Sequence, residues 1–176
     1  MNLRRVNDEV FVSDEPIVRL GGGEIAFLKQ QARTNARKRA RVCAHKTNDD
    51  ALHEMIIAIS ASSYIHPHKH VGKSESFHII EGEVDVVIFN EDGAILDVIE
   101  LGEPRSGHKF YYRLTDSIFH TLLVRTDFLV VHEVTNGPLN RERTFLAPFA
   151  PPESKVGEAQ NYMRHISDAV VQHLGR

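Results

Sequence analysis

The sequence predicts a mainly β protein, a sandwich or a small barrel with helical segments at both ends. Short apolar runs are separated by turn signals between residues 51 and 148, and residues 84–89 alternate with a period of two. Helical patterns lie outside this region. At 176 residues, of which 41% are hydrophobic, the chain can build a core as one domain with short extensions.

Residues 1–50 are expected to form a basic, mostly helical lead-in. They are polar, and the segment "GEIAFLKQQARTNARKRARV" (residues 23–42) is rich in good helix formers. Within it, Ile25, Leu28 and Ala32 recur at helical spacing. The lead-in therefore precedes the β region as a separate helical segment in this prediction.

Residues 51–148 are expected to form the barrel from successive short strands. Turn signals at Gly82 and at residues 90–93 enclose a strand whose side chains alternate between two faces. The segment "HTLLVRTDFLVVHEV" (residues 120–134) predicts two more strands around a polar turn at residues 125–127. Many short strands with evenly spaced turns are typical of sandwiches and small barrels.

Residues 149–176 are expected to form a proline-rich linker followed by an amphipathic helix. The prolines exclude a helix or a central strand at the start of this segment. Further on, Met163, Ile166, Val170 and Leu174 form one apolar helical stripe. We expect this stripe to pack on the barrel or on a second subunit.

The charge distribution predicts a small anionic partner rather than a nucleic acid. The net charge is −3, with 21 basic and 24 acidic residues, but the basic residues are unevenly placed. A partner of opposite charge is plausible near a basic segment, whereas an acidic remaining surface repels phosphates. The segment between Glu24 and Asp49 has no acid and these basic residues: Lys29, Arg33, Arg37, Lys38, Arg39, Arg41 and Lys46.

The composition favours a cytoplasmic protein without a membrane segment. No stretch approaches the roughly 20 apolar residues of a membrane span, and no apolar signal-peptide core follows the first residues. The single cysteine, Cys43, cannot form an internal disulfide, which fits a reducing compartment. We expect it to be a small buried thiol rather than a nucleophile.

Histidines concentrate in "SYIHPHKHVGKSESFHIIEG" (residues 63–82). Alternate side chains of a strand point the same way, so His68 and His70 share a face. A turn after His70 brings Glu75 back toward the two imidazoles, and His120 at the head of a later strand is the best further candidate. Two or three imidazoles with a carboxylate fit a divalent transition metal, such as iron, nickel, manganese or zinc.

A simpler interpretation remains open for these histidines. The chain has 11 histidines, and alternate histidines on a surface strand can form an exposed polar face. Spacing, carboxylate, glycine and the distant histidine together favour the metal site.

The segment "HKHVGKSESFHIIEG" resembles the first motif of the cupin superfamily. That motif is His-x-His, three or four residues, Glu, six residues, Gly, and His68, His70, Glu75 and Gly82 occupy its positions. In the second cupin motif a histidine supplies the last metal ligand, a position that His120 takes. The resemblance implies a double-stranded β-helix, a jelly-roll barrel with a metal ion inside its mouth.

Around His120 the sequence departs from the second motif. The family usually has Pro and Gly five and three residues before the histidine, where this chain has Thr115 and Ser117. Val124 stands where an asparagine often follows. We therefore expect a loop of different shape at this place.

The order of features over residues 32–152 is similar to the WbuC-type cupins found with surface-polysaccharide genes. These have an arginine-rich lead-in like "ARTNARKRARVCAH", a strand like "MIIAISASSYIHPHKH" and an exit like "VVHEVTNGPL". The resemblance implies a role in surface-polysaccharide biosynthesis, and cupins are often homodimers.

Other residues are candidates for catalysis or substrate binding. His132 and Glu133 occupy opposite faces of a late strand, so one of them should face the barrel interior and could carry a proton. Tyr112 could close the pocket. Arg39, Arg41 and His45 could hold an anionic substrate, because arginine binds carboxylates and phosphates with two hydrogen bonds. A basic outer face or a subunit contact is an equal alternative for the arginines, and packing for the tyrosine.

Two functions follow from these residues. One is a metal-dependent cupin enzyme, of the isomerase, epimerase, lyase or dioxygenase type, that acts on a small anionic metabolite or sugar derivative. The other is a non-catalytic or regulatory cupin module that binds a metal or a small ligand. A metal-free sugar-nucleotide ketoisomerase of the cupin type is a third possibility, against which Glu75 argues.

Overall fold

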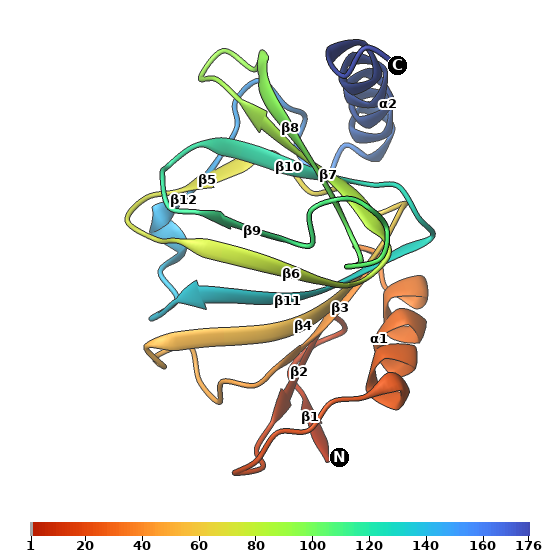
Figure 1. The fold of residues 1–176 in the computed structure, drawn as a ribbon. Coiled ribbons are helices and arrows are strands. Elements are labelled where there is room, and N and C mark those ends of the chain that lie inside the picture. The colour runs from red at the N-terminus through yellow and green to blue at the C-terminus, as the bar shows by residue number, and fades with distance from the viewer. Residues whose placement is uncertain (1) are drawn as a thin grey trace.

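A computed structural model describes residues 2–176 of the chain. Twelve strands and two α-helices follow one another, with a short 3-10 helix at Arg141–Arg143 (Figure 1). The elements are β1 (Leu3–Arg5), β2 (Val10–Ser13), α1 (Gly22–Thr34), β3 (Arg39–Cys43), β4 (Leu52–Ser60), β5 (His68–His70), β6 (Glu75–Glu81), β7 (Glu83–Phe89), β8 (Ile95–Gly102), β9 (Tyr111–Leu114), β10 (Phe119–Val124), β11 (Phe128–Asn136), β12 (Thr144–Leu146) and α2 (Val156–His173).

The strands form two sheets that enclose a common interior (Figure 1). The larger sheet has the order β1-β2-β3-β4-β11-β6-β9, and the smaller sheet has the order β12-β5-β10-β7-β8. Consecutive strands repeatedly change sheets, as β5 to β6 and β9 to β10 do. The chain therefore has the cupin-type double-stranded β-helix fold, which confirms the predicted class.

The interior is apolar at one end and polar at the other. Alternate residues of β7 behave as the sequence predicts, since Val84, Val86 and Ile88 are buried in the core between the sheets. The polar end contains His68 and His120, which belong to register-paired strands of the smaller sheet. The apolar packing fixes the positions of the strands that carry these polar side chains.

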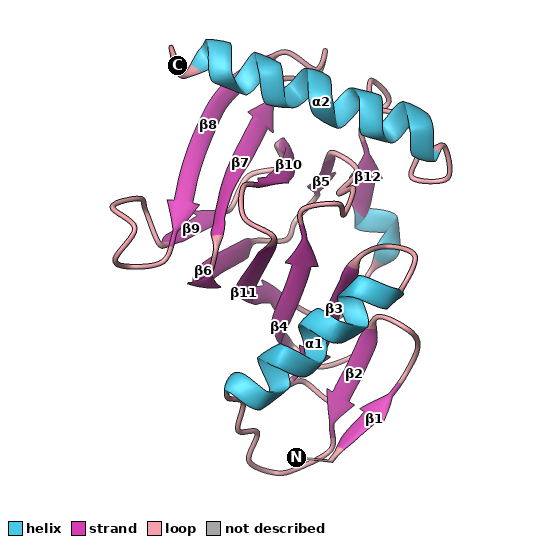
Figure 2. Cartoon of the chain, turned by 90° about the vertical axis from the view of Figure 1, so that its right-hand side faces the viewer, coloured by secondary structure: helices cyan, strands magenta, loops and turns pink. Residues whose placement is uncertain are grey.

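The two helices cover opposite outer faces of the barrel (Figure 2). In α1, Leu28 and Ala32 are fully buried in a cluster with residues of β3 and β4. In α2, Ile166 and Val170 of the predicted stripe pack on the smaller sheet. Among residues 2–176, no helix is both long enough and apolar enough to cross a membrane.

The expectation of a mostly helical lead-in is wrong before α1, where β1 and β2 add to the larger sheet, and wrong again beyond Thr34. α1 ends there, and Lys38 adopts a positive φ of 58° that helps redirect the chain. Residues 39–43 then form β3, an antiparallel neighbour of β4. The intrinsic helix preference of this arginine-rich segment is overridden by strand pairing, because Ala40 and Val42 are buried beneath α1.

Cys43 is buried on the interior face of β3, and burial raises the pKa of its thiol to about 11. The thiolate is the reactive form, and an unperturbed thiol titrates near a pKa of about 8.5. We therefore expect a disulfide reagent at pH 8 to modify the native protein at least roughly 100-fold more slowly than the denatured protein. Labelling at the rate of free cysteine in the native state would contradict this placement.

Candidate metal centre

The turn between β5 and β6, two strands of different sheets, brings His70 and Glu75 together. β5 ends at His70, the chain turns through Gly72 with a φ of +66°, and β6 begins at Glu75. The Nε2 atom of His70 lies 3.4 Å from a carboxylate oxygen of Glu75. Glycine suits this turn because side-chain-bearing residues rarely adopt such a φ.

His120 joins the cluster from β10, the neighbour of β5. His120 and His68 are register partners, so their side chains leave adjacent strands side by side. His68, His70 and His120 each offer a ring nitrogen, and these three atoms lie within 4.8 Å of one another. The structure thus brings together the three histidines that the sequence analysis selected.

Hydrogen bonds orient the imidazole rings. The Nδ1 atom of His68 lies 2.8 Å from the carbonyl oxygen of His66, and that of His120 lies 3.0 Å from the carbonyl oxygen of Ile118. A carbonyl can only accept, so each Nδ1 carries a proton and each Nε2 is left to bind a cation. The Nδ1 atom of His70 lies 2.9 Å from the Thr144 hydroxyl.

Glu75 connects the histidines to the larger sheet. Its side chain is 6% exposed, one carboxylate oxygen lies 2.8 Å from the Nε2 atom of His120, and the Tyr112 hydroxyl donates to the same oxygen at 3.1 Å. Burial raises the pKa of Glu75, but the bonds to His120 and His70 lower it more, so it stays well below the usual value. Glu75 is therefore ionised.

The electrostatics of the cluster fit a divalent transition metal. Burial, followed by the charge of His120, lowers the pKa of His68 to about 4, so its imidazole is neutral at neutral pH. Burial also lowers the pKa of His120, but the hydrogen bond to Glu75, the charge of that carboxylate and the bond to the Ile118 carbonyl together raise it more. Neutral imidazoles and a carboxylate are the donors that iron, nickel, manganese and zinc accept, and a bound cation can replace the proton that His120 shares with Glu75.

Tyr112 supports Glu75 rather than lying free in the interior. Its side chain is buried, so the hydroxyl has a fixed direction toward the carboxylate. We expect Tyr112→Phe to weaken metal binding roughly 10-fold, because ligand-supporting hydrogen bonds typically contribute 10- to 100-fold to affinity. Competition with a chromophoric chelator measures the affinity. An unchanged affinity would show that the hydroxyl does not support the ligand.

The structure separates His132 from Glu133. His132 faces outward, where its ring lies 3.6 Å from Glu54 and lines a surface pocket of about 450 Å³. Glu133 is the register partner of Phe77 and Met55, whose side chains are in the interior core. Burial, reinforced by the charge of Glu75, raises the pKa of Glu133 to about 7. Glu133 is thus the interior acid of the pair.

Arg39 and His45 are engaged away from the histidine cluster. Arg39 donates to the carbonyl oxygen of Tyr64 at 3.0 Å and to Glu153 at 3.1 Å, which ties β3 to the linker before α2. His45 stacks on His53 with a ring separation of 4.1 Å. Burial and the neighbouring His53 lower the pKa of His45. Both side chains stabilise the large sheet and its connections.

Two contacts of the cluster were not anticipated from the sequence. Thr144 supports His70 from β12, a strand that the sequence analysis did not predict. His66, which shares the alternation of His68 and His70, contacts the carbonyl oxygen of Ala147 at 3.0 Å. No local signal marks Thr144, since its role depends on a strand pairing across 74 residues.

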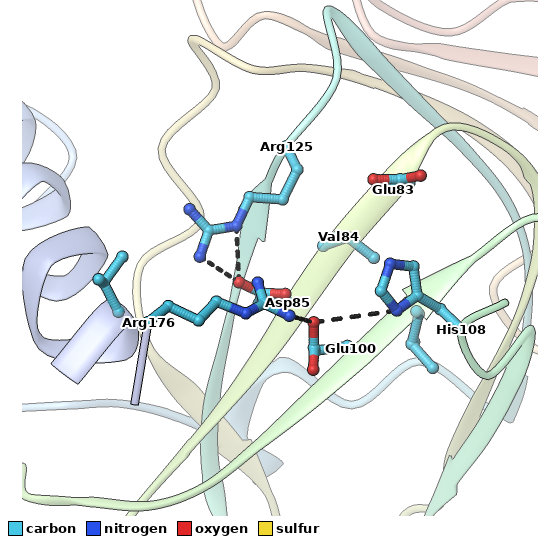
Figure 3. A pocket seen from close by; sticks show the side chains of 9 residues that line it. Glu83, Val84, Asp85, Glu100, His108, Arg125 and Arg176 are labelled. Atoms are coloured by element: carbon cyan, nitrogen blue, oxygen red, sulfur yellow. Dashed lines mark hydrogen bonds and ion pairs between the residues drawn. The ribbon is translucent and has the colours of Figure 1, made fainter. Parts of the chain in front are cut away.

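A separate pocket of about 250 Å³ lies between α2 and strands β7 and β8 (Figure 3). Its charged groups pair with one another: Arg125 donates to Asp85 at 2.6 Å, and Arg176 pairs with Glu100. Because Asp85 lies on the outer face of β7, this pocket is distinct from the histidine cluster. These pairs hold α2 and the end of the chain against the smaller sheet.

The fold and the histidine cluster together define a cupin-type barrel with a candidate metal centre. Residues 23–101, a little under half of the chain, match the model of a family described as a domain of unknown function, DUF6016. No curated protein matches the sequence. The WbuC-type resemblance stays a prediction.

Several solved structures are similar in fold. Protein SO0799 from Shewanella oneidensis has a TM-score of 0.53 at 9% identity, with 74% of this chain and 85% of that chain covered. A Klebsiella pneumoniae protein with a double-stranded β-helix domain has a TM-score of 0.48 at 16% identity, covering 65% of this chain and 87% of that one. A mutant oxalate decarboxylase of Bacillus subtilis has a TM-score of 0.44 at 17% identity, and the match spans 55% of this chain but only 24% of the decarboxylase.

Proposed function

We propose that this protein is a metal-dependent cupin enzyme that acts on a small anionic molecule. The observation that carries the proposal is the convergence of three imidazoles and an ionised carboxylate beside a second, interior acid. A site that only stores a metal has no need for an acid that titrates near neutral pH. The alternative, a non-catalytic binding module, uses the same ligands without a proton carrier.

His68, His70, Glu75 and His120 would hold the metal. A bound divalent ion would supply a Lewis acid that polarises an oxygen function of the substrate, or, as iron, a centre for oxygen chemistry. The protein would fix the ligands from two sides, because β5 and β10 are neighbours in the smaller sheet and β6 belongs to the larger sheet. This arrangement makes the site rigid.

Glu133 would hold and move a proton in the site. Its side chain faces the interior beside its register partners Met55 and Phe77, and burial is the main cause of its raised pKa. A carboxyl group with a pKa of about 7 is populated in both protonation states at neutral pH, which suits a general acid or base. Isomerisation, epimerisation and elimination all need such a group.

The broader assignments rest on the resemblance and on composition. A sugar derivative as substrate, a role in surface-polysaccharide biosynthesis, a cytoplasmic location and a homodimer are all part of the proposal. The uneven distribution of charge, with seven basic residues in residues 25–48, supports an anionic rather than a neutral substrate.

The test is to compare Glu133→Gln with His132→Gln, a matched change on the outer face of the same strand. Metal-loaded proteins are incubated in D2O with a panel of hydroxy, oxo and sugar acids, and deuterium incorporation is followed by NMR. Iron-loaded samples are also examined for oxygen consumption. We expect turnover in the wild type and in His132→Gln, and at least roughly 100-fold less in Glu133→Gln at equal metal content.

Turnover in Glu133→Gln equal to that of the wild type would show that Glu133 is not the proton carrier. Binding of panel compounds without turnover by any metal-loaded form would favour the non-catalytic module instead.

A further inference from the structure

Arg41 is an arginine directed into the barrel interior. In β3, Ala40 and Val42 pack beneath α1 on the outer face, whereas Cys43 belongs to the core between the sheets. Side chains alternate along a strand, so Arg41 shares the interior face with Cys43. The Nη1 atom of Arg41 lies 3.9 Å from the Met55 sulfur, which places the guanidinium over β4.

The guanidinium of Arg41 lacks strong partners. A thioether sulfur is a weak acceptor, and the Nε atom of Arg41 is buried with no hydrogen-bond partner in the described structure. Arg39, two residues earlier on the same strand, is bonded to Tyr64 and Glu153. A buried, unpaired donor on a charged group costs free energy, which a bound anion would recover.

Lys73 places a second positive charge on the same interior region. It belongs to the turn between β5 and β6, is half-buried, and makes no ion pair among residues 2–176. The charges of Arg41 and Lys73 each lower the pKa of Glu133, so both cations act on the same interior carboxyl group. Met55, which Arg41 contacts, is the register partner of Glu133 on the neighbouring strand.

We propose that Arg41 binds a carboxylate group of the substrate, with Glu133 between this carboxylate and the histidine cluster. The inference rests on the proposed function and names its substrate class: a small carboxylic acid with a second oxygen function several atoms away, such as a hydroxy acid or a sugar acid. The planar guanidinium binds a carboxylate by donating two parallel hydrogen bonds, for which Nε and one Nη atom are the natural donors.

The register of the large sheet sets the minimum length of the substrate. Glu133 is one strand and two residues away from Glu75, so their Cα atoms are roughly 8 Å apart by ordinary strand spacings. A molecule that reaches from Arg41 past Glu133 to the histidines must therefore be longer than oxalate. A phosphate ester fits less well, because a dianion beside Glu75 and Glu133 is repelled more strongly than a carboxylate.

The experiment is isothermal titration calorimetry on the full chain, with the metal content of every sample measured first. The probes are oxalate, succinate, gluconate, glucuronate, glucose and glucose 1-phosphate. The variants are Arg41→Gln, Arg41→Lys and the matched control Arg105→Gln, which removes an equal charge from an exposed loop. Circular dichroism and thermal unfolding verify that each variant is folded.

We expect the wild type to bind gluconate, glucuronate or succinate more tightly than oxalate, glucose or glucose 1-phosphate. Arg41→Gln should lose at least roughly 10-fold in affinity, Arg41→Lys should lose less, and Arg105→Gln should be unchanged, since a charge-assisted bidentate pair is commonly worth that much. If Arg41→Gln does not fold, Arg41→Lys alone must still show weakened binding of the carboxylic acids.

Three results would overturn the inference: carboxylic acids that do not bind the metal-loaded wild type, equal affinities in wild type and the Arg41 variants, or tighter Arg41-dependent binding of glucose 1-phosphate. The proposed function fails separately. If the wild type holds no metal but still binds gluconate through Arg41, the result supports the carboxylate site and contradicts the metal-dependent function.

Discussion

His120→Ala is expected to abolish stoichiometric metal binding while the barrel remains folded. His120 is 3% exposed in its side chain, its Nε2 atom faces Glu75, and it is the one histidine of the cluster supplied by β10. Without it, the smaller sheet supplies only His68 and His70, both from β5, and Glu75 of the larger sheet loses the imidazole that lies 2.8 Å from its carboxylate. We expect the metal affinity to fall by more than about 100-fold, beyond the effect of losing a supporting hydrogen bond.

His78→Ala is the matched control for this change. His78 lies on the exposed face of β6, where its ring contacts Phe110, and it is three residues from Glu75 in sequence. Metal content of both variants is measured after identical loading and removal of free metal. Full metal content in folded His120→Ala, or an equal loss in His78→Ala, would contradict the assignment of His120 as a ligand.

Gly82→Ala, outside the site, is expected to cause a large loss of stability. Gly82 connects β6 to β7 with a φ of +87°, and an added Cβ would overlap the Phe128 carbonyl oxygen and lie 2.5 Å from the Thr126 hydroxyl. The free-energy cost of the backbone strain adds to the cost of the overlap with fixed atoms. We expect the free energy of unfolding to fall by about 3–5 kcal/mol, measured by chemical denaturation.

Gly107→Ala separates the two contributions. Gly107 has a φ of +90°, but an added Cβ meets nothing within 4 Å. We expect a loss of only about 1–2 kcal/mol from the backbone conformation alone. Equal losses in the two variants would show that the close approach of β11 to Gly82 is not what requires glycine there.

Several barrel strands were predictable because they carry a local signal. The turn at residues 90–93 and the alternation of β7 both appear in the sequence, and so does the polar turn between β10 and β11. β3 was not predictable in this way. Its arginines and alanine favour a helix, and only pairing with β4 and burial under α1 select the strand.

The metal cluster was predictable for a related reason. His68, His70 and Glu75 lie on two consecutive strands joined by one short turn, so their convergence follows from spacing and a turn. His120 was a candidate from its place at the head of a strand and from the resemblance to the second cupin motif, and the changed residues Thr115 and Ser117 do not prevent it from facing Glu75.

The surrounding residues depend on tertiary contacts. The choice between His132 and Glu133 required the register of β11 against β4 and β6. The difference between Arg39 and Arg41 is also invisible in sequence, because both face the interior side of β3. Glu153, which is 114 residues further along the chain, forms an ion pair with Arg39. Among the described residues, no acidic side chain forms an ion pair with Arg41.

The metal content of the untagged wild-type protein tests the central claim most directly. Elemental analysis by mass spectrometry, before and after reconstitution with iron, nickel, manganese or zinc, gives the metal per chain. The histidine cluster and Glu75 predict about one divalent transition-metal ion per folded chain. A folded protein that retains no such metal after reconstitution would contradict the metal centre, and the function proposed from it would fall.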